Sequence, residues 1–535
     1  MKIAVLFSFL FLSTLSFGQI DLEHTYNDGV VTRIKLEYSG EKYYLFKSAT
    51  NELVFYNNDH SLWKTIILPA PAPTQYTHTL IFHVSEGVFN SDSNLEIIFG
   101  FFNGSLPGYQ AKVMAEDGTI IGSLDNVYSV AMSDLPNLPL KLIGTSYNPE
   151  SSKVYSVPEL SLEHVYTEGQ VSRVALENSG EKYYVADKVN GVEKVYNSDH
   201  TIWKTIALPK PADAFYSGNA AFISETAINS DNLLEIGYNY YTVVNSVYTY
   251  VGKIINENNT ALLTVPEASS MYISVLEGCE NKLMVRLWDN ANNITSNVYQ
   301  LPSLVLEHTY ESEVARIKLE NSGEKYYTSS YPLNHQAKVY NNDHSIWKTI
   351  TLPIPPDYYQ ITGIGNLSES KINADPLLEL SYTYFTAALE IAYFETQIIN
   401  ENGVNYLTIE GANSVYISEL TDLANKLIAT IQVSSFDSVH YYGKVYSLAP
   451  LATTSFEKGI HAVVAPNPTS SFLTITCKDS INEATLYNMT GERVKEFANQ
   501  DLRKINVENL PTGIYLLKLT DNNNQKSTHK ITITH

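Results

Sequence analysis

Three short segments of the sequence combine an aspartate, a histidine and a tryptophan in the same order. These side-chain types can hold a metal ion or transfer protons. Asn and Asp also bond to the backbone two residues on, which favours a tight turn, and a Trp four residues after the Asp can pack under the following strand. We interpret the segments as structural turns, with a metal or ligand site as the alternative. Their key residues are Asp59 and Trp63, Asp199 and Trp203, and Asp343 and Trp347.

A pair of carboxylates four residues apart also recurs three times. The pairs are Asp92 and Glu96, Asp231 and Glu235, and Asp375 and Glu379. Paired carboxylates can bind calcium or act as acid and base. A calcium loop needs more oxygen ligands in a short span than Asn90, Asp92 and Glu96 supply. We expect turns here and no cofactor, with calcium as the alternative.

Motifs of catalysis and phosphate binding are missing from the sequence. It contains no Gly-X-Ser-X-Gly, no Gly-rich phosphate loop and no His-Glu-X-X-His. Constellations that occur three times also argue against an enzyme, because a catalytic site is usually asymmetric. Candidates confined to one copy, which an enzyme would need, have the pattern of loop residues and do not converge on one motif. They include Asp187, Asp289 and His335.

Pairs of tyrosines offer a different chemistry. They could stack on sugar rings or anchor a protein partner, although such tyrosines are more often half-buried strand residues. The pairs are Tyr240 and Tyr241, Tyr358 and Tyr359, and Tyr441 and Tyr442.

These residues belong to a unit that is written three times. The copies begin at Leu22-Glu23-His24-Thr25-Tyr26, Leu162-Glu163-His164-Val165-Tyr166 and Leu306-Glu307-His308-Thr309-Tyr310, and each continues with Ser-Gly-Glu-Lys-Tyr-Tyr and Trp-Lys-Thr-Ile. The sequence therefore predicts three repeats between two terminal segments. We divide the chain into a signal peptide (1–18), repeat 1 (20–161), repeat 2 (162–304), repeat 3 (305–450) and a C-terminal domain (451–535).

Composition predicts an all-β protein, because 12% aromatic residues with 39 Tyr, 26 Gly and 21 Pro suit short strands joined by tight turns. Each repeat has room for eleven or twelve strands, or about three four-stranded blades. We expect a β-propeller-like ring, and its blade count stays open: three blades per repeat would give nine, which is more than the usual four to eight, and two per repeat would give six. Three tandem β-sandwiches are the alternative architecture.

Charge and cysteine content restrict the class of protein further. The net charge of −22 argues against a nucleic-acid partner, because phosphate binding needs clustered Lys and Arg. Cys279 and Cys477 lie in different expected domains, so we expect no disulfide framework. At the N-terminus, Lys2 precedes an apolar run from Ala4 to Leu15, which is typical of a signal peptide. No stretch reaches the roughly 20 apolar residues that a transmembrane helix needs.

The C-terminal segment carries a specific resemblance. Its motifs begin with Ala465-Pro466-Asn467-Pro468-Thr469 and continue through Gly491 to Leu510-Pro511-Thr512-Gly513-Ile514-Tyr515. Pro466 and Pro468 give a stiff extended entry, and Gly491 and Gly513 permit tight turns. The segment resembles the type A C-terminal sorting domain of the type IX secretion system of Bacteroidota. The resemblance implies recognition by the outer-membrane translocon, removal by a sortase-like peptidase, and a protein that is secreted or attached to the outer-membrane surface.

The repeats are similar to those of uncharacterised Bacteroidota surface proteins, through Ser-Gly-Glu-Lys-Tyr-Tyr and Trp-Lys-Thr-Ile, and this similarity implies no activity. Our leading hypothesis is a non-catalytic binding or adhesion protein with a glycan or protein ligand. The alternatives are an exported glycoside hydrolase or polysaccharide lyase and a structural component of a surface layer or matrix.

Overall fold

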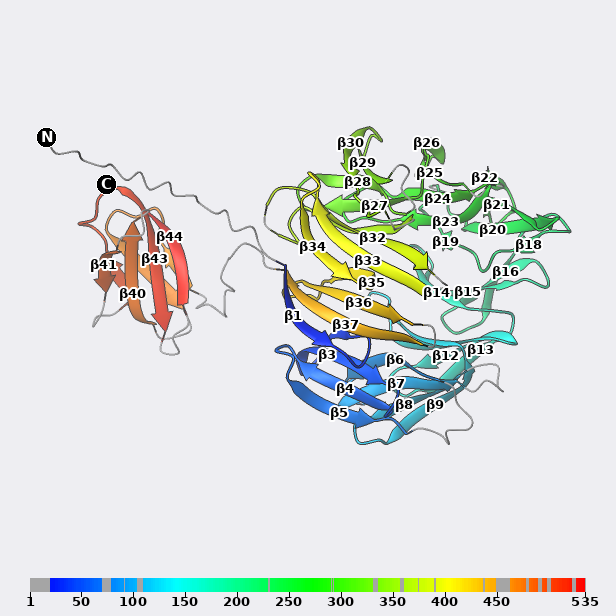
Figure 1. The fold of residues 1–535 in the computed structure, drawn as a ribbon, viewed down its shortest axis with the longest axis horizontal. Coiled ribbons are helices and arrows are strands. Elements are labelled where there is room, and N and C mark those ends of the chain that lie inside the picture. The colour runs from blue at the N-terminus through cyan, green and yellow to red at the C-terminus, as the bar shows by residue number, and fades with distance from the viewer. Residues whose placement is uncertain are drawn as a thin grey trace. The chain divides into compact units, whose positions relative to one another are not determined.

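The computed structural model divides the chain into two compact units, residues 1–450 and 451–535 (Figure 1). The predicted signal peptide, residues 1–18, lies outside the described residues. The described residues are 20–69, 78–90, 92–102, 109–229, 231–289, 291, 293–330, 335–356, 360–373, 375–388, 391–435, 438–448, 462–477, 481–488, 493–497, 502–521 and 526–534.

The described part of the first unit forms nine antiparallel sheets, which we number as blades in chain order. Three blades begin in repeat 1. Blade 1 contains β2 (Thr32–Leu36), β3 (Gly40–Lys47), β4 (Glu52–Asn57) and β5 (Leu62–Ile67); blade 2 contains β6 (His78–Glu86), β7 (Leu95–Phe102), β8 (Tyr109–Ala115) and β9 (Ile120–Val127); blade 3 contains β10 (Ser129–Ser133), β11 (Lys141–Tyr147), β12 (Glu150–Ser156) and β13 (Leu162–Tyr166).

Repeat 2 supplies the next three blades. Blade 4 contains β14 (Ser172–Leu176), β15 (Gly180–Asp187), β16 (Val192–Asn197) and β17 (Ile202–Ala207); blade 5 contains β18 (Phe215–Tyr216), β19 (Phe222–Ser224), β20 (Glu235–Val244), β21 (Val247–Asn256) and β22 (Ala261–Pro266); blade 6 contains β23 (Ala268–Ser274), β24 (Lys282–Trp288), β25 (Ile294–Gln300) and β26 (Val305–Tyr310). In blade 5, β18 and β19 pair with different parts of β20.

Repeat 3 supplies the last blades. Blade 7 contains β27 (Val314–Leu319), β28 (Gly323–Thr328), β29 (Gln336–Asn341) and β30 (Ile346–Thr351); blade 8 contains β31 (Gln360–Ser368), β32 (Glu379–Ala388), β33 (Ile391–Asn400) and β34 (Asn405–Glu410); blade 9 contains β35 (Ala412–Ser418), β36 (Lys426–Ser434), β37 (Val439–Leu448) and β1 (Ile20–Tyr26).

The ring is closed by the first strand of the chain, because β1 pairs antiparallel with β37 and completes blade 9. Hydrophobic clusters fill the space between every two neighbouring blades, including blades 9 and 1, where Tyr26 and Val445 pack on Tyr43. The prediction of a propeller is confirmed, and its blade count is nine rather than six. Each sequence repeat starts one strand before its first blade, so β13 and β26 belong to the blades of the preceding repeat.

Burial explains the strand sequences. The two neighbours of a blade cover the two faces of its middle strands, so β7 reads Leu-Glu-Ile-Ile-Phe-Gly-Phe-Phe with nearly every residue buried. The outer strand β5 reads Leu-Trp-Lys-Thr-Ile-Ile and buries only Ile66.

The second unit contains two sheets around one apolar core that includes Leu473, Leu486 and Leu517. Their strands are β38 (Ala462–Ala465), β39 (Phe472–Cys477) and β42 (Lys504–Asn506) in one sheet, and β41 (Arg493–Phe497), β40 (Ile481–Asn488), β43 (Gly513–Asp521) and β44 (Lys526–Ile533) in the other. No helix in the described part of the chain is long and apolar enough to cross a membrane.

Candidate functional site

The repeated aspartates lie in the turn before the outermost strand of blades 1, 4 and 7. The Asp59 carboxylate accepts hydrogen bonds from the Ser61 amide and hydroxyl at 3.0 and 2.6 Å, and His60 between them has a φ of 64°. These hydrogen bonds hold the pKa of Asp59 below its usual range. Asp199 and Asp343 make the same two contacts with Thr201 and Ser345.

The histidine of this turn points to a strand of the preceding blade. His60 Nδ1 lies 2.8 Å from the Tyr26 hydroxyl, and the His60 ring stacks on His24 with centroids 4.8 Å apart. Its Nε2 lies 3.5 Å from the Glu23 carboxylate. Burial lowers the pKa of His60 despite this carboxylate. The motif that begins each repeat therefore contacts the Asp-His motif of the same repeat across a blade junction.

The repeated tryptophan lies between two lysines. The Trp63 ring has the ammonium groups of Lys42 and Lys64 at 4.8 and 4.4 Å from its centroid, and it packs against the core between blades 1 and 2. Trp203 and Trp347 have equivalent lysines. Cation–π contact accounts for the lysines of the Gly-Glu-Lys and Trp-Lys motifs. The described residues contain no group of three or more His, Cys, Asp or Glu arranged for a metal ion.

Two sets of inter-blade clamps were missed at the sequence level. Arg33 pairs with Glu41 at 2.7 Å and donates to the carbonyls of Ser418 and Ala424 in blade 9. Glu86 of blade 2 accepts hydrogen bonds from the backbone of Tyr38 and Ser39 in blade 1. Both residues recur in the other two repeats, Arg33 as Arg173 and Arg316, and Glu86 as Glu225 and Glu369. This recurrence in the sequence could have indicated their structural role.

The repeated carboxylate pairs differ among the copies. Glu96 is fully buried and accepts hydrogen bonds from Ser85 and from the amides of residues 88–90. Glu235 and Glu379 are equally buried, but neither carboxylate has a hydrogen-bond partner among the described residues. Burial, reinforced by Asp231 and Asp375, raises the pKa of Glu235 to about 8 and that of Glu379 to about 9.

The polar residues confined to one copy lie in three different blades. Asp187 ends β15 and accepts hydrogen bonds from the amide and side chain of Asn190. Asp289 follows β24 and is held in the same way by Asn293. His335 precedes β29 and has a φ of 54°. The structure does not bring these three residues together.

A fourth one-copy residue was missed. Glu193 is 0% exposed on β16, and neither carboxylate oxygen has a hydrogen-bond partner among the described residues. Burial raises its pKa to about 8. Its strand partner is Ile206, whereas the equivalent isoleucines of repeats 1 and 3 face Leu53 and Ala337. The sequence could have indicated this residue, because the other two repeats have the apolar residues Leu53 and Ala337 at the position of Glu193.

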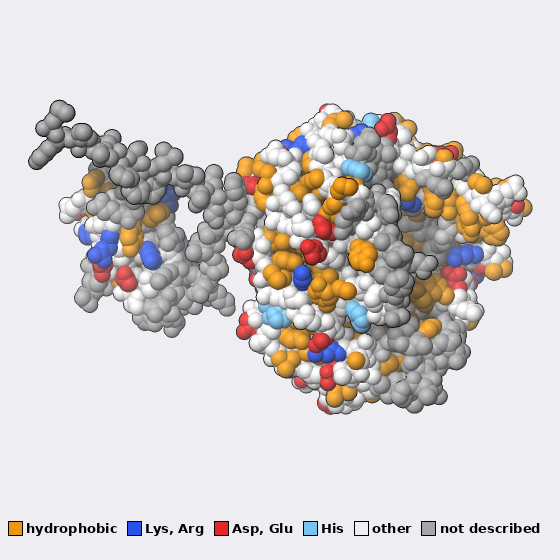
Figure 2. Space-filling model, in the orientation of Figure 1, with side chains coloured by type: hydrophobic (Ala, Val, Ile, Leu, Met, Phe, Trp, Pro, Cys, Tyr) orange, Lys and Arg blue, Asp and Glu red, His pale blue; other side chains and the backbone are white. Residues whose placement is uncertain are grey.

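Aromatic side chains of repeat 2 contact one another beside the long hairpin that β20 and β21 form at the edge of the ring (Figure 1), where Figure 2 shows hydrophobic side chains on the surface. Phe215 contacts Tyr241, Tyr241 contacts Tyr248 and Tyr250, and Tyr250 lies nearly parallel to a tryptophan of blade 6, at 12° and 5.9 Å. We call this surface the aromatic shelf. It consists of Phe215, Tyr241, Tyr248, Tyr250 and Trp288, of which Phe215, Tyr248 and Trp288 are 57%, 51% and 37% exposed.

Only part of the shelf follows from the tyrosine pairs in the sequence. Tyr241 belongs to it, but its neighbour Tyr240 points to the opposite face of the strand and is buried. Tyr441 is exposed on β37, and Tyr358 and Tyr359 lie outside the described residues. Trp288 was missed because it arrives from the next blade.

The motif residues of the second unit hold its two sheets together. Asn467, between Pro466 and Pro468, donates to the Lys530 carbonyl and accepts from the Thr532 amide, both at 2.8 Å. The Tyr515 hydroxyl, two residues after Gly513, donates to the Pro511 carbonyl. Leu510 packs against the core, and Gly491 lies outside the described residues.

Solved structures resemble the chain only distantly. One is "Structure of Dos1 propeller", which is 11% identical, covers 81% of this chain and 96% of that chain, and has a TM-score of 0.36. Another is BamB from Moraxella catarrhalis, which is 10% identical, covers 70% of this chain and 99% of that chain, and has a TM-score of 0.34. A third is dihydro-heme d1 dehydrogenase NirN in complex with DHE, which is 10% identical, covers 75% of this chain and 73% of that chain, and has a TM-score of 0.35. No curated protein matches the chain.

The C-terminal unit, in contrast, has a family match. Residues 463–534 match the family described as "Secretion system C-terminal sorting domain". These residues include the Pro-Asn-Pro entry and the Leu-Pro-Thr-Gly-Ile-Tyr segment that carried the resemblance to type IX sorting domains. The second unit is thus a type IX secretion C-terminal sorting domain, and the protein that carries it is secreted or attached to the cell surface.

Proposed function

We propose that the protein is a non-catalytic binding protein of the cell surface, whose aromatic shelf binds carbohydrate. The observation that carries this proposal is the exposure of several large aromatic rings that contact one another on repeat 2. Contiguous exposed apolar surface on a soluble domain is typical of an interaction site.

The arrangement of the rings favours a chain of ring-shaped units as ligand. Tyr248 and Tyr250 lie 17° from parallel, and Tyr250 and Trp288 lie 12° from parallel, at centroid distances of 6.4 and 5.9 Å. Tyrosine and tryptophan offer a flat apolar face together with a hydrogen-bonding group, which matches the mixed apolar and hydroxyl surface of a sugar. Arg286 beside Trp288 is paired with Glu313, so its charge is compensated.

Support for a non-catalytic role comes from the one-copy polar residues. Asp187 and Asp289 bond within their own turns, and they lie in blades 4 and 6. The proposal needs no metal or cofactor. For export, we propose that the type IX translocon reads the sorting domain and that a sortase-like peptidase removes it, which leaves the ring secreted or attached to the outer membrane as an adhesin.

Repeat 3 provides the substitutions for a test. The positions of Tyr248 and Trp288 hold Ala392 and Gln432 there, so Tyr248→Ala with Trp288→Gln borrows residues that the fold already accepts. We expect the full chain to bind polysaccharides on an array or in affinity electrophoresis, and the double variant to lose at least tenfold in affinity, since stacked aromatic contacts are each worth about 1 kcal/mol.

The matched control is Tyr393→Ala, which removes a similarly exposed tyrosine from repeat 3. It should leave binding unchanged. If the folded wild-type protein binds no polysaccharide on the arrays, the proposal is contradicted. Cleavage of a polysaccharide that survives the shelf substitutions would favour the enzyme alternative instead.

A further inference from the structure

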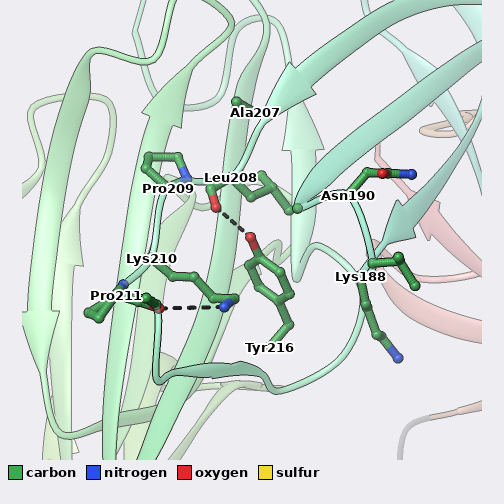
Figure 3. A pocket seen from close by; sticks show the side chains of 11 residues that line it. Lys188, Asn190, Ala207, Leu208, Pro209, Lys210, Pro211 and Tyr216 are labelled. Atoms are coloured by element: carbon green, nitrogen blue, oxygen red, sulfur yellow. Dashed lines mark hydrogen bonds between the residues drawn. The ribbon is translucent and has the colours of Figure 1, made fainter.

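A pocket of about 340 Å³ lies in repeat 2 between blades 4 and 5 (Figure 3). One wall is the tip of the β15–β16 hairpin, from Lys188 to Gly191, and the other is the segment from Ala207 to Ala212 that follows β17. The ring of Tyr216 lies between these walls, and its hydroxyl donates to the Leu208 carbonyl at 2.5 Å. The volume of the pocket is near the lower end for small-ligand sites, so it suits one unit of a larger ligand.

Lysine brings positive charge to this pocket in an otherwise acidic protein. The ammonium of Lys210 lies 5.1 Å from the centroid of the Tyr216 ring and donates to the carbonyls of Ala214 and Pro211 at 2.6 and 3.4 Å. Both of these acceptors are main-chain carbonyls, so no carboxylate among the described residues neutralises it. Lys188 also lines the pocket, but its ammonium is paired with Glu150 at 3.0 Å.

Both lysines are particular to repeat 2. Repeats 1 and 3 have Ala70 and Ile354 at the position of Lys210, and Ser48 and Tyr331 at the position of Lys188. The chain as a whole carries a net charge of −22, so a cationic pocket in one repeat has the opposite sign to the net charge of the chain. Local fields of this kind favour ligands of the opposite charge.

The pocket and the aromatic shelf share strand β18. Phe215 belongs to the shelf and Tyr216 to the pocket, and they pair with Tyr241 and Tyr240 of β20. Because neighbouring residues of a strand point to opposite faces, one ligand that crosses the edge of β18 can contact both.

We propose that this pocket binds an anionic group, a carboxylate or a sulfate, of an acidic polysaccharide whose other units stack on the shelf. The inference rests on the proposed function and assigns its ligand class. The Lys210 ammonium exchanges its carbonyl contacts for the anion, while Tyr216 packs against the sugar ring. A charge-assisted contact of this kind is stronger than a neutral hydrogen bond and weakens as salt rises.

Gly191 keeps the pocket open. Its φ is +66°, and a Cβ placed on it would lie 3.0 Å from the Tyr216 hydroxyl. Repeats 1 and 3 adopt the same backbone conformation with Asn51 and His335, at φ of 52° and 54°. A side chain at residue 191 is therefore compatible with the turn, but it would extend toward Tyr216 and occupy pocket volume.

The experiment measures binding of the full chain to polygalacturonate, dextran sulfate and neutral dextran at low and high salt. Lys210→Ala and Gly191→Asn take their new residues from repeat 1. Lys318→Ala, with Ala175 as its precedent in repeat 2, removes an exposed lysine of repeat 3 as the control. We expect about a tenfold loss of affinity for the acidic polymer in both pocket variants, the effect of about one charge-assisted hydrogen bond, and no loss in the control.

The outcomes separate the two proposals. Binding of polygalacturonate alone identifies a carboxylate, and binding of dextran sulfate alone identifies a sulfate. Equal binding of neutral dextran, with no effect of Lys210→Ala, overturns the acidic ligand and leaves carbohydrate binding by the shelf intact. If none of the polymers binds the folded protein, the inference and the proposed function both fail. Thermal unfolding of each variant checks that Gly191→Asn is folded, and Lys210→Ala tests the pocket independently of that turn.

Discussion

The hydroxyl of Tyr26 lies 2.8 Å from Nδ1 of His60, and this contact joins the last blade of the ring to the first. Tyr26 ends β1, the strand that completes blade 9, whereas His60 lies in the turn before β5 of blade 1. The same pair occurs as Tyr166 with His200 and as Tyr310 with His344. The most recognisable sequence motifs therefore meet at the three junctions where one repeat follows the next.

Replacing Tyr26 by Phe removes this contact and leaves His60 Nδ1 without its partner. We expect a loss of about 1 kcal/mol in the free energy of unfolding, the usual net value of one buried hydrogen bond, as measured by urea denaturation. Tyr147→Phe changes an exposed tyrosine and should have no measurable effect. Equal stability of both variants would show that the contact does not contribute.

Acid should weaken the same junctions. Burial lowers the pKa of His60, His200 and His344 below the usual 6.5. The unfolded chain then binds more protons than the folded chain as pH falls through 6.5, so this contribution to stability is present above 6.5 and is lost below it. We expect the melting temperature to fall between pH 7 and pH 5. His60→Asn, which tolerates the positive φ, should reduce the size of that fall.

Arg33 should be the most sensitive residue of the ring closure. Its side chain is fully buried, and it bonds Glu41 in blade 1 and two carbonyls in blade 9. Substitution by Leu leaves Glu41 without its cation, and breaking a buried pair in this way costs about 3 kcal/mol. Lys35→Gln is the control, because the contacts of Lys35 within the described part of the chain are an exposed pair with Asp422 at 3.6 Å and a hydrogen bond to the Thr421 carbonyl. If Arg33→Leu lowers the free energy of unfolding no more than Lys35→Gln does, Arg33 does not stabilise the junction between blades 9 and 1.

The repeat and its many short strands made a propeller-like ring predictable, but the sequence left the blade count open between nine and six. The clamps were not predictable from spacing, since Arg33 and Ser418 are 385 residues apart and nothing local in the sequence pairs them. Only part of the aromatic shelf could be predicted from the sequence. The sequence pair Tyr240 and Tyr241 suggested that tyrosines could stack on a sugar, but strand alternation places Tyr240 in the core, and Trp288 comes from the next blade.

The sorting domain can be tested through one side chain. Asn467 bridges the Pro-Asn-Pro entry to β44 by two hydrogen bonds of 2.8 Å. We expect Asn467→Ala to loosen this entry and to reduce the amount of protein outside the cell, measured by immunoblot of medium and surface-shaved cells. Asn506→Ala, on β42, is a control within the same unit. Unchanged export after deletion of residues 451–535 would contradict a sorting role altogether.

Glu193 predicts an unusual dependence of stability on pH. Burial raises its pKa from the ordinary 4.5 to about 8, so the folded chain holds a proton that the unfolded chain releases. Stability is therefore fully present below pH 4.5, falls as pH rises, and levels off above pH 8, with a cost of about 3 kcal/mol at pH 7. Leu53 occupies the equivalent position of repeat 1, so Glu193→Leu should stabilise the protein at pH 7 by about this amount.

The same substitution should have little effect at about pH 3, because the wild-type side chain is then neutral in both states. Glu193→Ala, which borrows the residue that repeat 3 has at Ala337, separates the charge from the packing: it removes the titration but adds no apolar volume. The measurement is the melting temperature of the wild type, Glu193→Leu and Glu193→Ala from acidic pH up to pH 8. Parallel curves for wild type and both variants would mean that Glu193 reaches solvent and ionises at an ordinary pKa.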